Sequence, residues 1–286
     1  MKLLVTGASG FLGQRLCRCL SRSHDITALY ASHKPALPGV AWWRYRHGTD
    51  AAEALPTDIE GIVHLAQSAQ YRDFPNGADD MFGVNVDFLF RLLEHARKCG
   101  VSTFVDTSTG GVYEGASAPF GEALAVTPRN FYAASKLAGE VLCQPYRELF
   151  PVAVLRLFFI YGPGQIGRLV PNLAERIRCG HPVDLTGANG GLRITPTYVD
   201  DVVDVIATAL EERWDGIFNV ASDEVISIEE LARHIGRLLG REPVFRRNEG
   251  KDPGSMVPDL TALRAQFDMS RFRCFADAVA DALPRG

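Results

Sequence analysis

The chain has 286 residues, a formal net charge of −4 and a sequence pI near 6.0. This length suits one large α/β domain, or a main domain with a smaller lobe, and either buries a substantial core. The mildly acidic balance gives no electrostatic reason to expect a nucleic acid or an anionic membrane as a partner. The opening apolar run is too short for a signal peptide and no apolar run reaches membrane-spanning length, which predicts a cytoplasmic protein.

The six cysteines and seven histidines are dispersed along the chain. They form neither Cys-x-x-Cys pairs nor a compact set with the spacing of metal ligands. The sequence therefore predicts reduced structural thiols and no metal site.

The first thirteen residues predict a short apolar strand that runs into a glycine-rich turn and a helix. Gly7 permits a tight turn, Gly10 lets the backbone approach a pyrophosphate, and Gly13 lets the helix pack closely on the strand. The free N–H groups and the positive dipole end of the helix would face the phosphates. The phosphate loop of nucleoside triphosphatases needs a glycine, four further residues and then Gly-Lys-Ser/Thr. The positions five beyond Gly7 and Gly10 are Leu12 and Arg15 instead of glycine, which disfavours a nucleoside triphosphatase.

Strands and helices alternate over the first 157 residues, which predicts a parallel sheet. After the first strand, the expected strands cover residues 25–30, 59–66, 103–107 and 152–157, and the expected helices cover residues 11–21, 79–99 and 132–149. Glycine-rich segments follow Tyr161, before a helix at 200–211 and a strand at 216–220. Ser227 and Glu230 form a capping-box pattern, which predicts a helix from there to about Gly240.

This order of elements predicts an α/β fold, a Rossmann-type doubly wound parallel sheet with a smaller mixed substrate-binding lobe. We expect residues 1–160, with a return segment of about 195–221, to form the dinucleotide-binding domain. The remaining segments, about 161–194 and 222–286, are expected to form the substrate-binding lobe.

The helical pattern of residues 79–99 carries two neighbouring apolar stripes, Phe88 with Leu92 and Leu89 with Leu93. Two stripes are wider than one sheet-facing side requires. Either one chain buries this whole face, or the second stripe lies in a dimer interface formed together with the helix of residues 132–149. We expect a homodimer.

Tyr132 and Lys136 lie four residues apart in an expected helix, so their side chains project from the same face. Tyrosine exchanges protons poorly at neutral pH unless its phenolate is stabilised. The positive charge of Lys136 lowers the tyrosine pKa, which favours an acid/base role for Tyr132. An exposed helix with an accidental Tyr and Lys is the alternative. The hydroxyls of residues 107–109, at the end of an expected parallel strand, favour the catalytic interpretation.

Segments along nearly the whole chain resemble, in order, the extended short-chain dehydrogenases/reductases, specifically the NAD-dependent epimerase/dehydratase family that acts on nucleotide sugars. The matching segments are residues 6–13, 63–66, 85–86, 107–113, 132–136, 155–156, 161–165, 193, 199–201 and 218–220. Their joint order is more specific than any one motif. The resemblance implies an enzyme that transfers hydride between a nicotinamide and a sugar carbon.

The resemblance also implies three sets of site residues. Catalytic roles fall on Thr109, Tyr132 and Lys136. The residues expected to bind the cofactor are Gly7, Ser9, Gly10, Phe11, Leu12, Gly13, Ser32, Lys34, Leu65, Ala66, Gln67, Asn85, Thr107, Tyr132, Lys136 and Phe158. The residues expected to bind substrate are Ser108, Thr109, Phe159, Gln165 and Arg193, with Arg193 on a substrate phosphate.

Departures from the family pattern bear on the cofactor and the substrate. After the strand at 25–30, where NAD-preferring relatives carry an acidic residue, Ser32 and Lys34 are able to bind a 2′-phosphate, which favours NADP over NAD. A solvated turn at His33 and Lys34 is the alternative. His47 stands where relatives often have an Asp near the adenine. Phe159 replaces an Asn that relatives use for the nucleotide sugar. Residues 110–111 are Gly-Gly where sugar 4,6-dehydratases have Asp-Glu, which disfavours dehydration.

Three functions are therefore open. The first is an NAD(P)-dependent nucleotide-sugar epimerase that removes a hydride and returns it to the other face of the sugar. The second is an NADPH-dependent 4-ketoreductase of a nucleotide-linked keto-sugar or another small carbonyl compound. The third, a catalytically silent cofactor-binding protein, is disfavoured by the intact set of Thr109, Tyr132 and Lys136.

Overall fold

The computed structural model describes residues 1–51, 54–116, 118–187, 189–250 and 253–283. The chain forms two units. The first comprises residues 1–115, 125–156 and 203–218, and the second comprises residues 116–124, 157–202 and 219–286. The domain boundaries expected from the sequence stay a prediction.

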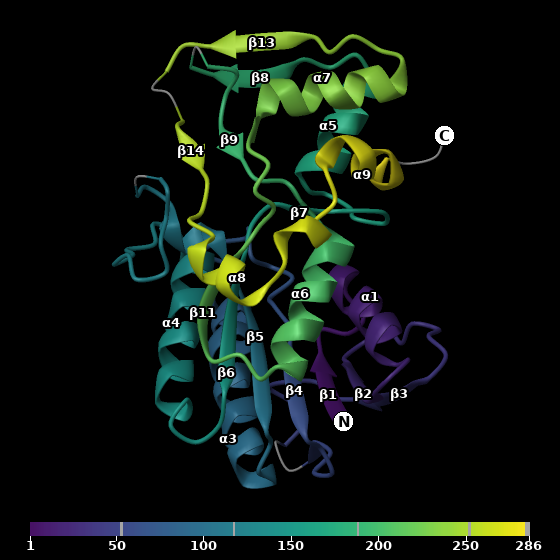
Figure 1. The fold of residues 1–286 in the computed structure, drawn as a ribbon, viewed down its shortest axis with the longest axis vertical. Coiled ribbons are helices and arrows are strands. Elements are labelled where there is room, and N and C mark those ends of the chain that lie inside the picture. The colour runs from purple at the N-terminus through teal and green to yellow at the C-terminus, as the bar shows by residue number, and fades with distance from the viewer. Residues whose placement is uncertain (52–53, 117, 188, 251–252, 284–286) are drawn as a thin grey trace. The chain divides into compact units, whose positions relative to one another are not determined.

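A seven-stranded sheet forms the base of the first unit (Figure 1). In spatial order its strands are β11 (Gly216–Val220), β6 (Val152–Leu157), β5 (Thr103–Thr109), β4 (Gly61–His64), β1 (Lys2–Thr6), β2 (Asp25–Tyr30) and β3 (Val40–Arg44). The pairs β1–β2, β1–β4, β2–β3 and β4–β5 are parallel. The expected α/β class with a parallel sheet is confirmed, while β3 was not predicted.

Helices cover both faces of this sheet. One face carries α3 (Leu89–Cys99) and α4 (Phe131–Tyr146), and the other carries α1 (Phe11–Leu20) and α6 (Val199–Glu211) (Figure 1). A short helix α2 (Ala78–Phe82) and a π-helical turn (Gly83–Phe88) run directly into α3, which ends at Gly100 with a left-handed φ of 66°. A 3-10 turn (Gly110–Tyr113) follows β5. The strands thus direct their carboxyl ends toward the residues predicted to form the site.

The two apolar stripes, which begin at Phe88 of the π-helical turn and continue into α3, do not lie on an exposed face, so the sequence-based reason for a dimer interface there was wrong. Phe88 is 5% exposed, and Leu89, Leu92 and Leu93 are fully buried in one cluster with residues of the sheet and Cys143 of α4. Because α4 packs against α3 and the preceding turn, one chain covers both stripes.

The second unit has small sheets and a core of its own. Its paired strands are β7 (Ile160–Tyr161) with β10 (Thr197–Tyr198), β8 (Val183–Thr186) with β13 (Phe245–Asn248), and β12 (Ile226–Ser227), β9 (Arg193–Ile194) and β14 (Ser255–Met256). Its helices are α5 (Leu169–Arg178), α7 (Ile228–Leu239), α8 (Thr261–Gln266) and α9 (Phe275–Ala282), with a 3-10 turn at Met269–Arg271. The expected capping box of Ser227 and Glu230 starts α7, and Gly240 ends it.

None of the helices in the described parts of the chain is long and apolar enough to span a membrane.

Candidate active site

The turn between β1 and α1 has the backbone geometry of a phosphate cradle. Gly7 has a φ of 62°, and a Cβ on it would lie 2.6 Å from the backbone of Leu65 and Ala66. A Cβ on Gly13 would lie 2.7 Å from the Cα of Ala8. Gly10 caps α1 without any side-chain hydrogen bond, and the first turn of α1 carries no acidic residue. The amide groups at this helix end are therefore open to an anion.

His64 joins the cradle to the neighbouring strands. Its Nδ1 lies 2.7 Å from the Thr6 hydroxyl oxygen, which also accepts a hydrogen bond from the backbone N–H of Ala66 at 3.3 Å. Its carbonyl accepts the Thr107 hydroxyl at 3.1 Å. Burial, followed by the charge of Lys136, holds the pKa of His64 well below its usual value. His64 thus joins the ends of three strands: its neutral imidazole contacts β1, and its backbone carbonyl, in β4, accepts a hydrogen bond from β5.

Tyr132 and Lys136 both lie in the first two turns of α4. Asn130 caps this helix by accepting the Ala133 N–H at 2.9 Å. Tyr132 donates its hydroxyl to the side-chain oxygen of Gln67 at 3.0 Å, and Tyr71 packs edge-on against its ring. Lys136 is 2% exposed. The structure therefore brings Tyr132 and Gln67 together. The acid/base role of Tyr132 and the cofactor-binding role of Gln67 stay predictions.

A hydrogen-bond chain ties α4 to the segment after β4. Asn85, in the π-helical turn, accepts the Ser68 backbone N–H at 3.3 Å and donates its amide to Ser135 at 2.9 Å. The Ser135 hydroxyl in turn donates to the backbone carbonyl of Tyr132 at 2.8 Å. This chain fixes the start of α4, where Tyr132 lies, relative to the segment that follows β4.

The two hydroxyl residues at the end of β5 differ in their surroundings. Thr109 is half-buried, and its Oγ1 accepts the Gly111 N–H at 3.0 Å. Ser108 is buried and donates its hydroxyl to Glu140 of α4. The Ser108 oxygen is thus engaged inside the unit, and its predicted contact with substrate stays a prediction.

A buried ion pair lies under this site and was not predicted from the sequence. Glu140 and Arg156 are 2% and 3% exposed in their side chains, with an N–O distance of 2.6 Å. The Arg156 guanidinium also donates to the Tyr113 hydroxyl and lies 4.9 Å from the centre of its ring. Lys136, Glu140 and Cys143 are spaced so that they share one face of the helix. This spacing was the signal in the sequence that could have predicted the burial of Glu140.

Ser32, Lys34 and His47 are the residues predicted to lie near the adenosine part of the cofactor. Ser32 and Lys34 are exposed beyond the end of β2. His47 lies 3.1 Å from Asp87 and stacks on Phe88 at 5.0 Å between ring centres. Burial lowers the pKa of His47 despite the opposing charge of Asp87. A neutral His47 therefore stands where relatives were expected to have an acid.

Four predicted residues belong to the second unit. Phe158 is buried, and its N–H donates to the Val220 carbonyl at 3.1 Å. Phe159 has a φ of 40°, a strained left-handed conformation for an aromatic residue. Gln165 donates to the Ile160 carbonyl at 2.7 Å, and its Oε1 is buried without a partner among the described residues. Arg193 is exposed on β9.

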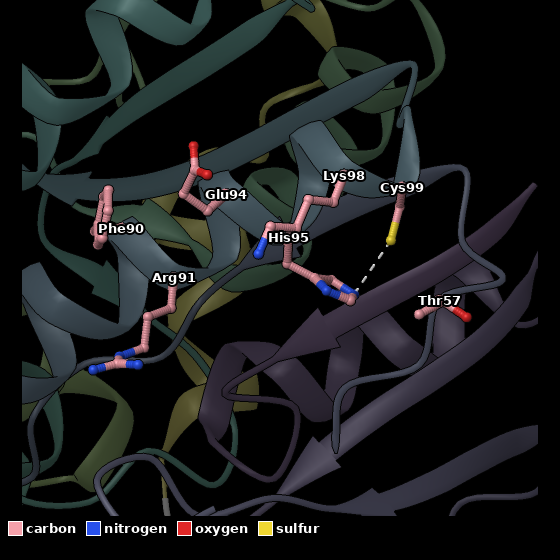
Figure 2. A pocket seen from close by; sticks show the side chains of 7 residues that line it. All are labelled: Thr57, Phe90, Arg91, Glu94, His95, Lys98 and Cys99. Carbon is pink, nitrogen blue, oxygen red and sulfur yellow. Dashed lines mark hydrogen bonds between the residues drawn. The ribbon is translucent and has the colours of Figure 1, made fainter. Parts of the chain in front are cut away.

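A groove of about 690 Å³ lies on the outer side of α3, away from all of these residues (Figure 2). Its lining residues are Thr57, Phe90, Arg91, Glu94, His95, Lys98 and Cys99. Figure 2 shows the Cys99 thiol directed toward the His95 ring, at a distance of 3.6 Å from Nε2. No residue expected to bind cofactor or substrate lines this groove.

The family model "NAD dependent epimerase/dehydratase family" matches residues 3–221. An uncharacterized UDP-glucose epimerase of Bacillus subtilis, YtcB, is 32% identical over 91% of this chain and 90% of its own. A dTDP-4-dehydro-6-deoxy-D-allose reductase of Streptomyces bikiniensis is 30% identical over 93% of this chain and 90% of its own. The UDP-glucuronic acid 4-epimerase of Bacillus cereus, solved in complex with NAD, superposes with a TM-score of 0.86 at 23% identity, over 98% of this chain and 97% of that one.

Proposed function

The chain is an enzyme of the NAD-dependent epimerase/dehydratase family, and from this premise we propose that it transfers hydride at a carbon of a nucleotide-linked sugar. The observation that carries the proposal is the placement of Tyr132 and Lys136 on a helix start that hydrogen bonds fix to the same unit as the glycine cradle. The named relatives are epimerases and a reductase of nucleotide-linked sugars.

The residues present fit a dinucleotide. Gly7 and Gly13 leave the turn between β1 and α1 without side chains, because a Cβ at either position would clash with backbone atoms. The N-terminus of α1 beside this turn suits a pyrophosphate. A dinucleotide held by its pyrophosphate at this cradle would supply, through its nicotinamide ring, the hydride acceptor and donor. Tyr132 exchanges the proton of the reacting sugar hydroxyl, Thr109 hydrogen-bonds that oxygen, and the Lys136 ammonium favours the phenolate.

A direct assay separates the epimerase from its alternatives. The purified protein is incubated with UDP-glucose or UDP-glucuronate and either NAD or NADP, and in a parallel reaction with a nucleotide-linked 4-keto sugar and NADPH, and the sugars are separated by chromatography. An epimerase converts them to a mixture of epimers without net use of cofactor, whereas a ketoreductase consumes NADPH in proportion to a 4-keto sugar. We expect epimers. Retention of cofactor in native mass spectrometry without turnover of any sugar would instead indicate a silent binding protein.

We further propose that NADP is favoured over NAD, because the turn after β2 has Ser32 and Lys34 in place of a carboxylate. Replacing Ser32 by Asp adds a charge that repels a 2′-phosphate and accepts the ribose hydroxyls. We expect the ratio of NAD to NADP affinity to rise about tenfold, the effect of about 1.4 kcal/mol. Fluorescence titration with both cofactors measures the ratio. Ser23→Asp, at the opposite end of β2, should leave it unchanged; an equal change in both variants argues against the assignment.

A homodimer also remains part of the proposal, through the same two helices as first expected but through side chains other than the two apolar stripes. Phe90 of α3 is 44% exposed and Val141 of α4 is 61% exposed, and burying such side chains favours association. Light scattering at micromolar concentration should give twice the chain mass of 31.3 kDa. Phe90→Asp with Val141→Asp should give monomers, and Ile166→Asp, on the second unit, should not. A monomeric parent protein would contradict the proposal.

A further inference from the structure

The buried Glu140–Arg156 ion pair joins four segments of the first unit. Arg156 Nε, from β6, lies 3.1 Å from both carboxylate oxygens of Glu140, and its Nη2 lies 2.6 Å from Oε2. The Ser108 hydroxyl, near the end of β5, donates to the same carboxylate, and the Arg156 guanidinium donates to the hydroxyl of Tyr113. All four residues are at most 5% exposed. At such burial water does not replace a lost hydrogen bond, so the loss costs more than at the surface.

The ion pair anchors the segment that carries Thr109 at both of its ends. Ser108 precedes Thr109, and Tyr113 closes the 3-10 turn that follows it. Between these two anchors Thr109 is half-buried, and its Oγ1 accepts the Gly111 N–H at 3.0 Å. The Gly111 carbonyl in turn accepts the Glu114 N–H at 3.1 Å. The turn is thus held by short-range hydrogen bonds of its own and by two side-chain anchors to one ion pair.

The same ion pair reaches the helix that carries Tyr132. Glu140 lies one helical turn beyond Lys136, which itself lies one turn beyond Tyr132. Helix α4 packs against both β5 and the 3-10 turn. The approach is close at the helix start, since a Cβ on Gly111 would lie 3.9 Å from the Cβ of the alanine that follows Tyr132. A shift of the turn along this helix would therefore displace Thr109 relative to Tyr132.

We propose that Ser108 and Tyr113 are positioning residues that act through the buried ion pair. Together they hold Thr109 in register with Tyr132. The inference rests on the roles proposed above for these two residues at the reacting sugar oxygen. That oxygen has to lie within hydrogen-bond reach of both hydroxyls at once, and small displacements of such groups lower turnover steeply. An arginine–carboxylate pair suits this task, because its planar, bidentate contact has a fixed geometry.

The first test needs no substrate, because it follows backbone hydrogen exchange by mass spectrometry. Ser108→Ala removes one anchor and Tyr113→Phe removes the other, while the ion pair and the ring beside Arg156 remain. In each variant we expect the amides of residues 109–114 to exchange about tenfold faster, the effect of one lost buried hydrogen bond. The peptide of residues 1–13, which contains the cradle, should exchange as in the parent protein. Unchanged exchange of residues 109–114 in either variant overturns the proposal.

The second test separates positioning from binding. In turnover assays, Ser108→Ala is expected to lower kcat about tenfold, with the KM for the sugar and the affinity for the cofactor unchanged. A rise in KM at constant kcat would instead assign Ser108 a direct contact with substrate and overturn the proposal.

Ser102→Ala is the matched control. Ser102 precedes the opposite end of β5, and its hydroxyl donates to the Glu60 carbonyl at 3.0 Å. This variant should leave hydrogen exchange of residues 109–114 and turnover as in the parent, and an equal effect of both serine variants also contradicts the proposal. A protein inactive on every sugar overturns the proposed function alone, since the exchange of residues 109–114 still decides whether the two anchors hold Thr109.

Discussion

Tyr132→Phe is expected to lower turnover by at least ~100-fold, the usual scale of a lost general acid or base. The ring and its edge-on contact with Tyr71 remain, so the loss is confined to the hydroxyl that now donates to Gln67. Cofactor affinity should stay within about twofold of the parent value, since the cradle residues are untouched. Single-turnover measurement of the sugar products, beside a titration with cofactor, tests both statements.

The matched control for this variant is Tyr71→Phe. Tyr71 packs against the same ring from the segment after β4, and its substitution also deletes one phenolic hydroxyl near the site. It should cost much less activity than Tyr132→Phe. Near-normal turnover in Tyr132→Phe, or an equal loss in both variants, would remove Tyr132 from its acid/base role.

Arg156→Met is expected to lower the free energy of unfolding by about 3–5 kcal/mol, because it leaves the Glu140 carboxylate buried and uncompensated. Arg156 also donates to the Tyr113 hydroxyl, a contact that is lost at the same time. Urea denaturation followed by circular dichroism measures the change. The double variant Glu140→Gln with Arg156→Met should recover part of it, since no unpaired charge remains.

Arg147→Met provides the comparison. Arg147 pairs with Asp215 at 2.8 Å, but their side chains are 33% and 42% exposed. Water and salt screen such a pair, so its loss should cost about 1 kcal/mol or less. If the two arginine variants were equally destabilised, burial of the Glu140–Arg156 pair would not be the reason for the loss.

Much of the fold followed from local patterns. The strands at 25–30, 152–157 and 216–220 and the capping box of Ser227 were predicted with the bounds that the structure has. Strand β3 was missed because it lies at the sheet edge, where Trp43 and Arg44 are exposed and no apolar alternation marks it. Local patterns also overestimated the exposure of α3, since they do not show that α4 covers it.

The same limit applies to the site. The spacing of Tyr132 and Lys136 placed both on one helix face, because that relation depends on helix geometry alone. The contact of Gln67 with Tyr132 and the Glu140–Arg156 pair join residues from separate strands and helices. Such pairings depend on the packing of the sheet against α4, which sequence spacing does not specify.

The turn at Gly7 and Gly13 and the exposed turn after β2 differ in how well they tolerate amino-acid substitution. At both positions any side chain would clash with backbone atoms, so substitution of either glycine is not tolerated. Ser32 and Lys34, in contrast, are exposed beyond the end of β2. Under the role proposed above for these two residues, selection could exchange one dinucleotide for the other through a few surface substitutions. Such metabolic rewiring would leave the crowded glycine turn as it was.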